Sequence, residues 1–314
     1  MAGAALRLRS GNSIIMNAVA YKEYERRAYD AVAAAWTENV AANTAPYGRK
    51  LLDWLQLTRH SPMLDLACGS GDLGIYAATR FELNVTGVDI SEGLLEKARQ
   101  RAEGIPNIRF YHGDAEKLPF KEKQFDYAAC SLGVMFFPNT LKALAEIRRV
   151  LRPGGEASFV VWARPRRASC IGVAATSLAQ TMAPWYRRLL FRVPRFGTRM
   201  LYRYVERTIP GRGPSPMRFG RPSALPELLD RAGFAGRSVI EHTETWRYRD
   251  FDDFWERFIL STPGRAQHEK FSRSQIDEIR ARMQKKCRAY TTADGLAFPM
   301  TALLIRAERS SHDR

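Results

Sequence analysis

The sequence predicts an α/β fold built around a mostly parallel β-sheet. Short apolar runs alternate with amphipathic helical segments from about residue 61 onward, which is the pattern of strands joined by crossover helices. A glycine-rich turn directly follows the first apolar run, at the kind of position where parallel sheets bind ligands. The chain has 314 residues and 45% apolar composition, so it can bury one large core and still carry insertions.

Five strands are expected in the first half of the chain, each a short apolar run. They span residues 62–68, 84–89, 108–112, 125–131 and 157–163. One helix is expected to end at Thr79, a second to span residues 93–102 behind the N-cap Ser91, and a third to span residues 140–151. The order is that of successive strand–helix units.

The alternation stops at residue 164 and resumes after residue 222. The intervening segment contains seven prolines, which predict short helices and loops instead of sheet. Beyond it we expect three helices and two strands. The helices span residues 224–231, 251–261 and 274–290, and the strands span residues 238–248 and 299–307.

The glycine turn at residues 69–74 predicts a ligand site. It reads G-S-G-D-L-G and satisfies G-x-G-x-x-G, with Asp89 18 residues past Gly71, so spacing alone allows a dinucleotide. A dinucleotide would place its pyrophosphate at the start of the next helix, yet Asp65 precedes the turn and Asp72 follows Gly71. S-adenosylmethionine (SAM) has no phosphate and carries an ammonium and a sulfonium. The two carboxylates therefore favour SAM, with its methionine half beside them.

Further motifs in register resemble those of class I SAM-dependent methyltransferases, in particular the ubiquinone and menaquinone C-methyltransferase branch. The similar segments are residues 64–71 (LDLACGSG), 88–91 (VDIS), 113–120 (GDAEKLPF), 125–127 (FDY) and 148–155 (RRVLRPGG). The resemblance is detailed from about Tyr29 to Ala163 and weaker through Glu244. It implies a Rossmann-like methyltransferase sheet, mostly parallel with an antiparallel last strand, a helical cap insertion, and SAM as the cofactor.

Four regions are expected from these patterns. They are an N-terminal tail with cofactor-covering helices (1–49), a SAM-binding Rossmann-like core (50–163), an arginine-rich helical cap insertion (164–222), and a C-terminal completion of the sheet with extra helices (223–314).

The resemblance assigns cofactor contacts that each have a chemical reason. Asp89 can accept hydrogen bonds from both ribose hydroxyls, and bonds to a charged acceptor contribute about 1.5 to 3 kcal/mol each. Asp114 can accept the adenine amino group while the Ala115 N–H meets a ring nitrogen. Strand-end capping by Asp89 and a turn role for Asp114 are the alternatives. The expected cofactor-binding residues are Asp65, Ala67, Gly69, Ser70, Gly71, Asp89, Ile90, Asp114, Ala115, Ser131, Tyr29 and Trp36.

The N-terminal stretch at residues 29–36 is similar to the helix that closes over SAM in this family. Tyr29 and Trp36 are seven residues apart and would share one helical face. Aromatic pairs at this spacing are more often part of a hydrophobic core. Both interpretations, cofactor lid and core, stay open at this point.

Methyl transfer from a sulfonium is an in-line displacement with an activated leaving group, so alignment in a dry pocket can suffice. A general base is optional; His112 and His242 are the candidates, with structural roles as the alternative. Residues 130–133 lack the Asn/Asp-Pro-Pro-aromatic element of enzymes that methylate nucleobase or amide nitrogens. The apolar residues 134–137 that follow predict a hydrophobic acceptor, although core packing explains their phenylalanines equally well.

Positive charge is concentrated in one region. Residues 152–222 contain 14 arginines, no lysine and two acids, a net +12 of the chain's +16. Within residues 184–209, Arg195, Arg199, Arg203 and Arg207 recur every four residues beside apolar side chains. This basic amphipathic pattern predicts peripheral contact with an anionic membrane. A solvated face of an ordinary cap helix is one alternative, and an anionic acceptor or nucleic acid is another.

The remaining composition narrows the function. Four widely spaced cysteines fit reduced thiols in a cytoplasmic protein, and the histidine spacing predicts no metal site. Residues 1–15 are either a targeting peptide or an extension before Met16. We expect methyl transfer from SAM to an apolar, ring-bearing or lipid-like small molecule. There are two alternatives. One is an RNA methyltransferase, which the missing nitrogen-methylase element disfavours, and the other is a SAM-binding protein without transfer activity. The sequence does not define the oligomeric state.

Overall fold

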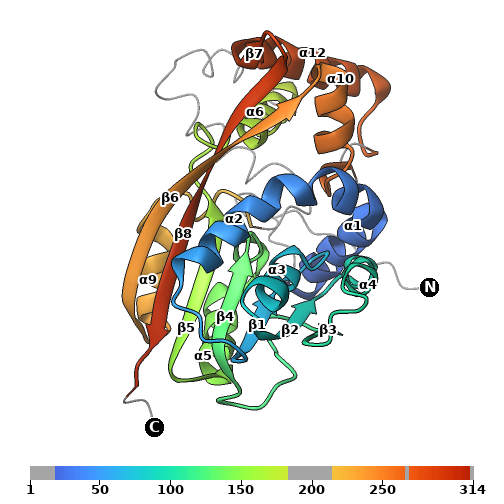
Figure 1. Cartoon of the computed structure of the whole chain (residues 1–314). Coiled ribbons are helices and arrows are strands. Elements are labelled where there is room, and N and C mark those ends of the chain that lie inside the picture. The colour runs from blue at the N-terminus through green and yellow to red at the C-terminus, as the bar shows by residue number, and fades with distance from the viewer. Residues whose placement is uncertain (1–17, 183–213, 266–268, 312–314) are drawn as a thin grey trace, which may run out of the picture.

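The computed structural model describes residues 18–182, 214–265 and 269–311 and contains one mixed sheet (Figure 1). The strand order is β3-β2-β1-β4-β5-β8-β6, with the short β7 paired to β8. This is the doubly wound order 3-2-1-4-5-6 with an antiparallel strand inserted before the last position. The arginine-rich segment 184–209 lies outside the described residues.

The first five strands are parallel and centre on β1. They are β1 (Pro62–Leu66), β2 (Asn84–Asp89), β3 (Ile108–His112), β4 (Phe125–Ser131) and β5 (Leu151–Trp162). Strand β1 pairs with β2 on one side and β4 on the other, so the order reverses there. Ligands of such sheets bind beyond the carboxyl ends of the strands at this reversal. The glycine turn follows β1 and lies at that edge.

Strand β5 begins earlier than predicted. The strand was expected at residues 157–163, but β5 begins at Leu151, and residues 153–155 lie within it as an irregularity in its pairing with β4. Leu151 pairs with Phe125 and Glu156 with Tyr127, so the extra residues bulge out of the ladder. Gly154 has φ +77°, a left-handed conformation that glycine adopts readily.

The two C-terminal strands are also longer than predicted. Strand β8 (Gly295–Arg309) runs antiparallel between β5 and β6 (Phe234–Tyr248), which confirms the antiparallel last strand. Their pairing continues from Phe234 opposite Arg309 to Tyr248 opposite Leu296. Both strands therefore extend past the parallel strands, and their far ends support a helical cap (Figure 1).

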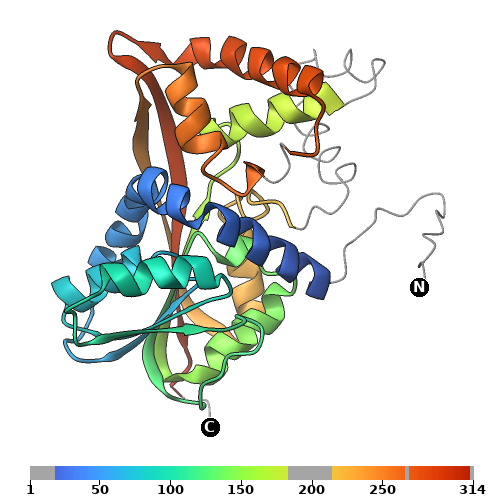
Figure 2. The ribbon, with the colours of Figure 1, turned by 90° about the vertical axis from the view of Figure 1, so that its right-hand side faces the viewer.

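Helices cover both faces of the sheet. They are α3 (Asp72–Arg80) and α4 (Glu92–Arg101) on one face, and α5 (Thr140–Val150) and α9 (Ala224–Arg231) on the other (Figure 2). The predicted N-cap Ser91 accepts a hydrogen bond from Leu94 N at 3.2 Å, and Asn139 caps α5 in the same way through Lys142 N at 3.1 Å. Each cap satisfies a backbone donor that the helix itself leaves unpaired.

The cap lies across the carboxyl edge of the sheet, with α1 (Ala18–Asn39) and α2 (Ala41–Trp54) between cap and sheet (Figure 2). It contains α6 (Ser169–Met182), α10 (Phe251–Phe254), the helical turn η2 (Trp255–Ile259) and α12 (Arg273–Cys287). The helix predicted at residues 251–261 changes to π-type bonding, because Leu260 N donates to Trp255 O at 3.0 Å. No helix in the described ranges is long and apolar enough to cross a membrane.

Candidate functional site

A cavity of about 410 Å³ lies where the strand order reverses. Its floor is formed by the ends of β1, β2 and β4, its side by residues 113–116 after β3, and its roof by α1. From there it continues upward into the cap. One continuous cavity therefore joins the sheet edge to the cap helices.

Eleven of the twelve residues predicted to contact the cofactor line this cavity; Gly71 does not. Gly71 was expected to bind the cofactor. Instead it has φ +84° at the start of α3, and a Cβ there would lie 3.0 Å from the Phe110 ring and 3.1 Å from Ala98. Gly69 differs, since it has φ +53° and a Cβ there would meet no atom within 4 Å. Only Gly69 leaves open space on the cavity side of the turn.

Asp89 connects the glycine turn to the start of α4. Its Oδ2 accepts from Gly69 N and its Oδ1 from Ser91 N, both at 2.8 Å. Asp89 is 9% exposed, and burial raises the pKa of its carboxyl although backbone donors, including Ser91 N and Gly69 N, oppose the rise. The strand-end capping role is therefore present. Each carboxylate oxygen has a second lone pair, so the carboxyl can still accept a ligand hydroxyl.

Asp65 and Asp72 both line the cavity, but their carboxylates have different environments. Asp72 forms a two-bonded ion pair with Arg101, at 2.7 and 2.9 Å. Asp65 is 1% exposed, and its Oδ2 has no hydrogen-bond partner among the described residues. Burial raises the pKa of Asp65 to about 8, and the nearby Asp89 and Asp72 add to the rise. Asp65 is thus the carboxyl that a bound cation would stabilise.

Asp114 lies beside the first turns of α1. Lys22 Nζ donates to Asp114 Oδ2 at 2.8 Å and to Glu116 Oε2 at 2.7 Å. Asp114 Oδ1 accepts from Glu116 N at 2.9 Å, which is the turn role left open from the sequence. Lys22 also lines the cavity and was not predicted. No local motif identifies it, because its partners lie 92 and 94 positions away.

The predicted aromatic pair on α1 lines the roof of the cavity. The rings of Tyr29 and Trp36 meet edge to face with centroids 5.4 Å apart, so they share one face of the helix. The ring of Tyr29 also packs edge to face against that of Phe136, with centroids 6.3 Å apart. The pair is therefore packed against other side chains and lines the cavity as well.

The upper part of the cavity is lined mainly by apolar side chains. Phe136 and Phe137, whose role the sequence left open, line it at the turn after β4. The cap helices contribute further residues that sequence patterns did not single out: Ile171, Ala174, Leu178, Phe258, Ile279 and Met283. This part of the cavity suits an apolar molecule.

Neither candidate histidine lines the cavity. His112 is exposed, and its Nε2 bonds Ile90 O at 3.0 Å. His242 on β6 contacts Glu244 Oε1 through Nε2 at 2.6 Å and packs against the Tyr47 ring. Both side chains are held in structural contacts, and their positions argue against a role as general base.

Comparison with known proteins agrees with this geometry. A family model described as a methyltransferase domain matches residues 63–155. A demethylmenaquinone methyltransferase of Staphylococcus epidermidis is 37% identical over 109 residues, which are 34% of this chain and 45% of that protein. The chain thus spans less than half the length of this curated relative.

Solved structures extend the comparison across the sheet and cap. Phosphoethanolamine N-methyltransferase 2 of Haemonchus contortus in complex with SAM superposes with a TM-score of 0.54 at 18% identity, covering 92% of this chain and 60% of that one. The [4+2]-cyclase SpnF gives 0.54 at 16% identity, covering 92% and 97%. Likeness at these identities concerns the fold. Residues 63–155 thus match a methyltransferase domain, and the sheet and cap around it have a fold that solved SAM-dependent methyltransferases share.

Proposed function

We propose that the protein transfers the methyl group of SAM to a carbon or oxygen atom of an apolar small molecule held under the cap. The observation that carries this proposal is the continuity of the cavity, from the carboxylate-bearing strand ends to the apolar side chains of α6, η2 and α12. A donor at the sheet edge and an acceptor in the cap would then meet in one space shielded from water.

The residues at the sheet edge suit the chemistry of SAM. Asp65, whose buried Oδ2 has no partner in the part of the chain that the structure describes, would hold the ammonium. The open space at Gly69 would admit the methionine half. Asp89 would bind the ribose hydroxyls, and Asp114 with the Ala115 N–H would bind adenine. SAM supplies a methyl group already activated on a sulfonium. The protein then contributes by aligning the acceptor and excluding water.

We propose an acceptor with a ring and an apolar chain, because the upper cavity is lined mainly by apolar and aromatic side chains. Supporting this class, the relatives with 35–40% identity over about a third of this chain are named demethylmenaquinone methyltransferases. Phe136 and Phe137 would contact the ring, and Ile171, Leu178 and Met283 the chain.

A proton must leave if the acceptor is a phenol or an enol. Burial raises the pKa of Tyr21 and of Tyr29, so neither tyrosine is a base at neutral pH. Glu25 lies one helical turn from each of them on α1 and also lines the cavity. We assign proton removal, where it is needed, to Glu25.

The test is transfer of labelled methyl from SAM to a reduced demethylmenaquinone carrying a short isoprenoid chain. Label in the organic extract together with an equal amount of S-adenosylhomocysteine is the expected result. SAM binding without S-adenosylhomocysteine release, tested also with other ring-bearing lipids, would contradict transfer. It would favour the second candidate, a SAM-binding protein of other activity. The [4+2]-cyclase SpnF, which has a similar fold, is the reason for naming this candidate.

A lipid-like acceptor also makes peripheral membrane contact part of the proposal. The basic amphipathic pattern at residues 184–209, argued from sequence alone, is the element we assign to it. Segment 184–209 follows α6, one wall of the upper cavity, in the chain. An acceptor drawn from a bilayer would then enter near the cap.

A further inference from the structure

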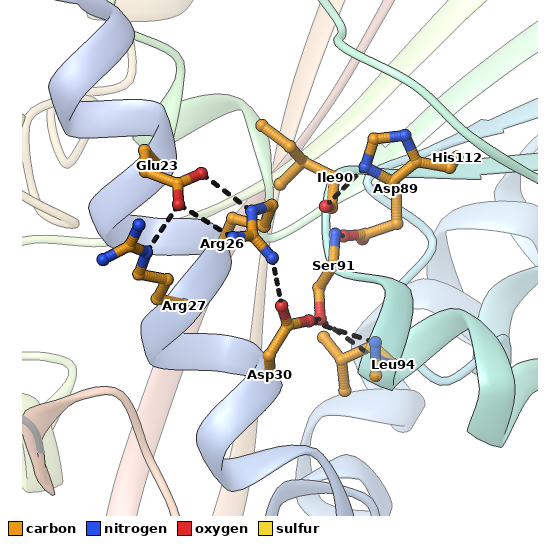
Figure 3. A network of polar contacts seen from close by, with 10 residues as sticks. Glu23, Arg26, Arg27, Asp30, Asp89, Ile90, Ser91, Leu94 and His112 are labelled. Atoms are coloured by element: carbon orange, nitrogen blue, oxygen red, sulfur yellow. Dashed lines mark hydrogen bonds and ion pairs between the residues drawn. The ribbon is translucent and has the colours of Figure 1, made fainter.

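Asp30 of α1 contacts the start of α4. Its Oδ1 accepts from Ser91 Oγ at 2.7 Å and from Gly93 N at 3.0 Å (Figure 3). Ser91 is the N-cap of α4 and accepts from Leu94 N. A residue 61 positions away in the chain therefore completes the capping of this helix, by satisfying a further backbone donor of its first turn.

The same capping group connects Asp30 to Asp89. Ser91 N donates to Asp89 Oδ1, and Ser91 Oγ donates to Asp30 Oδ1, so one residue joins the two carboxylates. The other oxygen of Asp30 is held by Arg26 Nη1 at 2.7 Å (Figure 3). Asp30 does not line the cavity, whereas Asp89 does. Any influence of Asp30 on a ligand must therefore act through other residues.

A steric feature serves the same contact between α1 and α4. A Cβ on Gly93 would lie 3.2 Å from both Ala33 Cβ and Asp30 Cα, and 3.3 Å from Asp30 Oδ1. Contacts this short require the neighbour to move, and one of these neighbours is backbone. The close approach of the two helices therefore depends on glycine at position 93 as well as on the hydrogen bonds of Asp30.

We infer that Asp30 is a positioning residue of the cofactor site. It seats α1 on α4 and, through Ser91, holds Asp89 in the orientation that the ribose of SAM requires. Tyr29 and Trp36 lie on the same helix and line the cavity, so the contact between α1 and α4 also sets the distance of these two rings from the cofactor. This inference rests on the cofactor assignment made under the proposed function.

The test measures SAM affinity by calorimetry, well below the unfolding temperature of every variant. Asp30→Ala should weaken SAM by about tenfold or more, because Ser91 Oγ and Gly93 N lose the oxygen that accepts from both of them. Asp30→Asn keeps an acceptor oxygen and should stay within about threefold of the parent. Gly93→Ala should also weaken SAM by about tenfold, although alanine favours the helix more than glycine does. Arg27→Gln is the matched control, since Arg27 lies on α1 and bonds Glu23 but not Asp30 among the residues that the structure describes (Figure 3).

Three outcomes separate the interpretations. Asp30→Ala or Gly93→Ala with parental SAM affinity would overturn the positioning role. Asp30→Asn as weak as Asp30→Ala would show that the ion pair with Arg26 matters instead, and would also overturn it. A parent protein that binds no SAM would reject the cofactor assignment itself, and this result is seen before any variant is compared.

Discussion

Arg101 pairs with Asp72 through two hydrogen bonds, and this ion pair distinguishes Asp72 from Asp65 on the opposite side of the glycine turn. Asp72 has its charge compensated within the protein. Asp65 is buried with an oxygen that has no partner among the described residues. A cationic ligand would therefore neutralise the charge of Asp65, whereas the charge of Asp72 is already neutralised by Arg101.

Asp65→Asn should change stability and SAM affinity in opposite directions. Burial raises the pKa of Asp65 to about 8, so the folded protein favours the protonated acid, and its stabilising contribution is lost as pH rises through about 8. Above that pH, removing the ionisable group should raise the free energy of unfolding of the ligand-free protein by about 1 to 3 kcal/mol. SAM should bind at least about tenfold more weakly, because its ammonium loses a carboxylate.

Urea unfolding at pH 6 and pH 9 and calorimetry with SAM measure the two effects. The stability gain should be larger at the higher pH. An Asp65→Asn protein that is less stable than the parent at both pH values would contradict the assignment of Asp65 as an uncompensated acid.

Gly69 and Gly104 form a matched pair for testing the glycine turn. Both have positive φ, +53° and +81°, and a Cβ on either would meet no atom within 4 Å, but only Gly69 lines the cavity. Valine at either position should lower the free energy of unfolding by about 1 to 2 kcal/mol through backbone strain. Only Gly69→Val should abolish SAM binding. Equal retention of SAM by both folded variants would place the methionine half elsewhere.

Sequence patterns predicted the strands best where polar residues bracket an apolar run. The bounds of β2, β3 and β4 match the expectation, because Asn84, Asp89 and His112 stand at strand ends. The extra length of β6 and β8 was missed. Tyr248 opposite Leu296 is a pairing between distant segments, and nothing local in either segment indicates it.

The residues of the site also fall into those that the sequence could predict and those that it could not. Residues that carry the cofactor motif on strand ends, such as Asp65 and Asp89, could be named in advance because parallel strands bring their carboxyl ends to one edge. Lys22, Ala174 and Met283 could not, because α1 and the cap reach the cavity only through tertiary packing. The same limitation applied to Gly71, whose motif position concealed a packing role.

Lys22→Met should destabilise the protein by about 1 to 3 kcal/mol, because Asp114 and Glu116 lose their shared cation. Burial opposes the charge of Lys22, but the bonds to both acids outweigh it and raise its pKa. The stabilisation should therefore be present at neutral pH and decline as pH rises through the raised pKa. Urea unfolding of parent and variant at pH 7 and about pH 11 measures this. Lys22→Arg should retain most of the stability. A difference in the free energy of unfolding between parent and Lys22→Met that is larger at high pH would contradict the explanation.

Ala174→Trp should fill the apolar part of the cavity from α6. We expect kcat/KM for the acceptor to fall by about tenfold or more while SAM affinity is unchanged, since the cofactor contacts lie on other elements. Ala174→Ser, which adds a single oxygen, is the control. Loss of SAM affinity in the tryptophan variant would mean that this part of the cavity belongs to the cofactor.

The arginine-rich segment at residues 184–209 lies outside the described residues. If it forms a basic amphipathic surface, the parent protein should bind vesicles that contain anionic lipid and should not bind neutral vesicles. Each engaged arginine should contribute roughly 1 kcal/mol, and salt should weaken the binding strongly. Replacing Arg195, Arg199 and Arg203 with glutamine should release the protein from the vesicles and leave SAM affinity unchanged.

Replacing the exposed Arg59, Arg99 and Arg152 removes the same charge from the described surface and should leave vesicle binding intact. Equal release by both triple variants would mean that net charge, and not this segment, draws the protein to the membrane; a fall in SAM affinity with the first triple variant would mean that the segment folds over the cofactor.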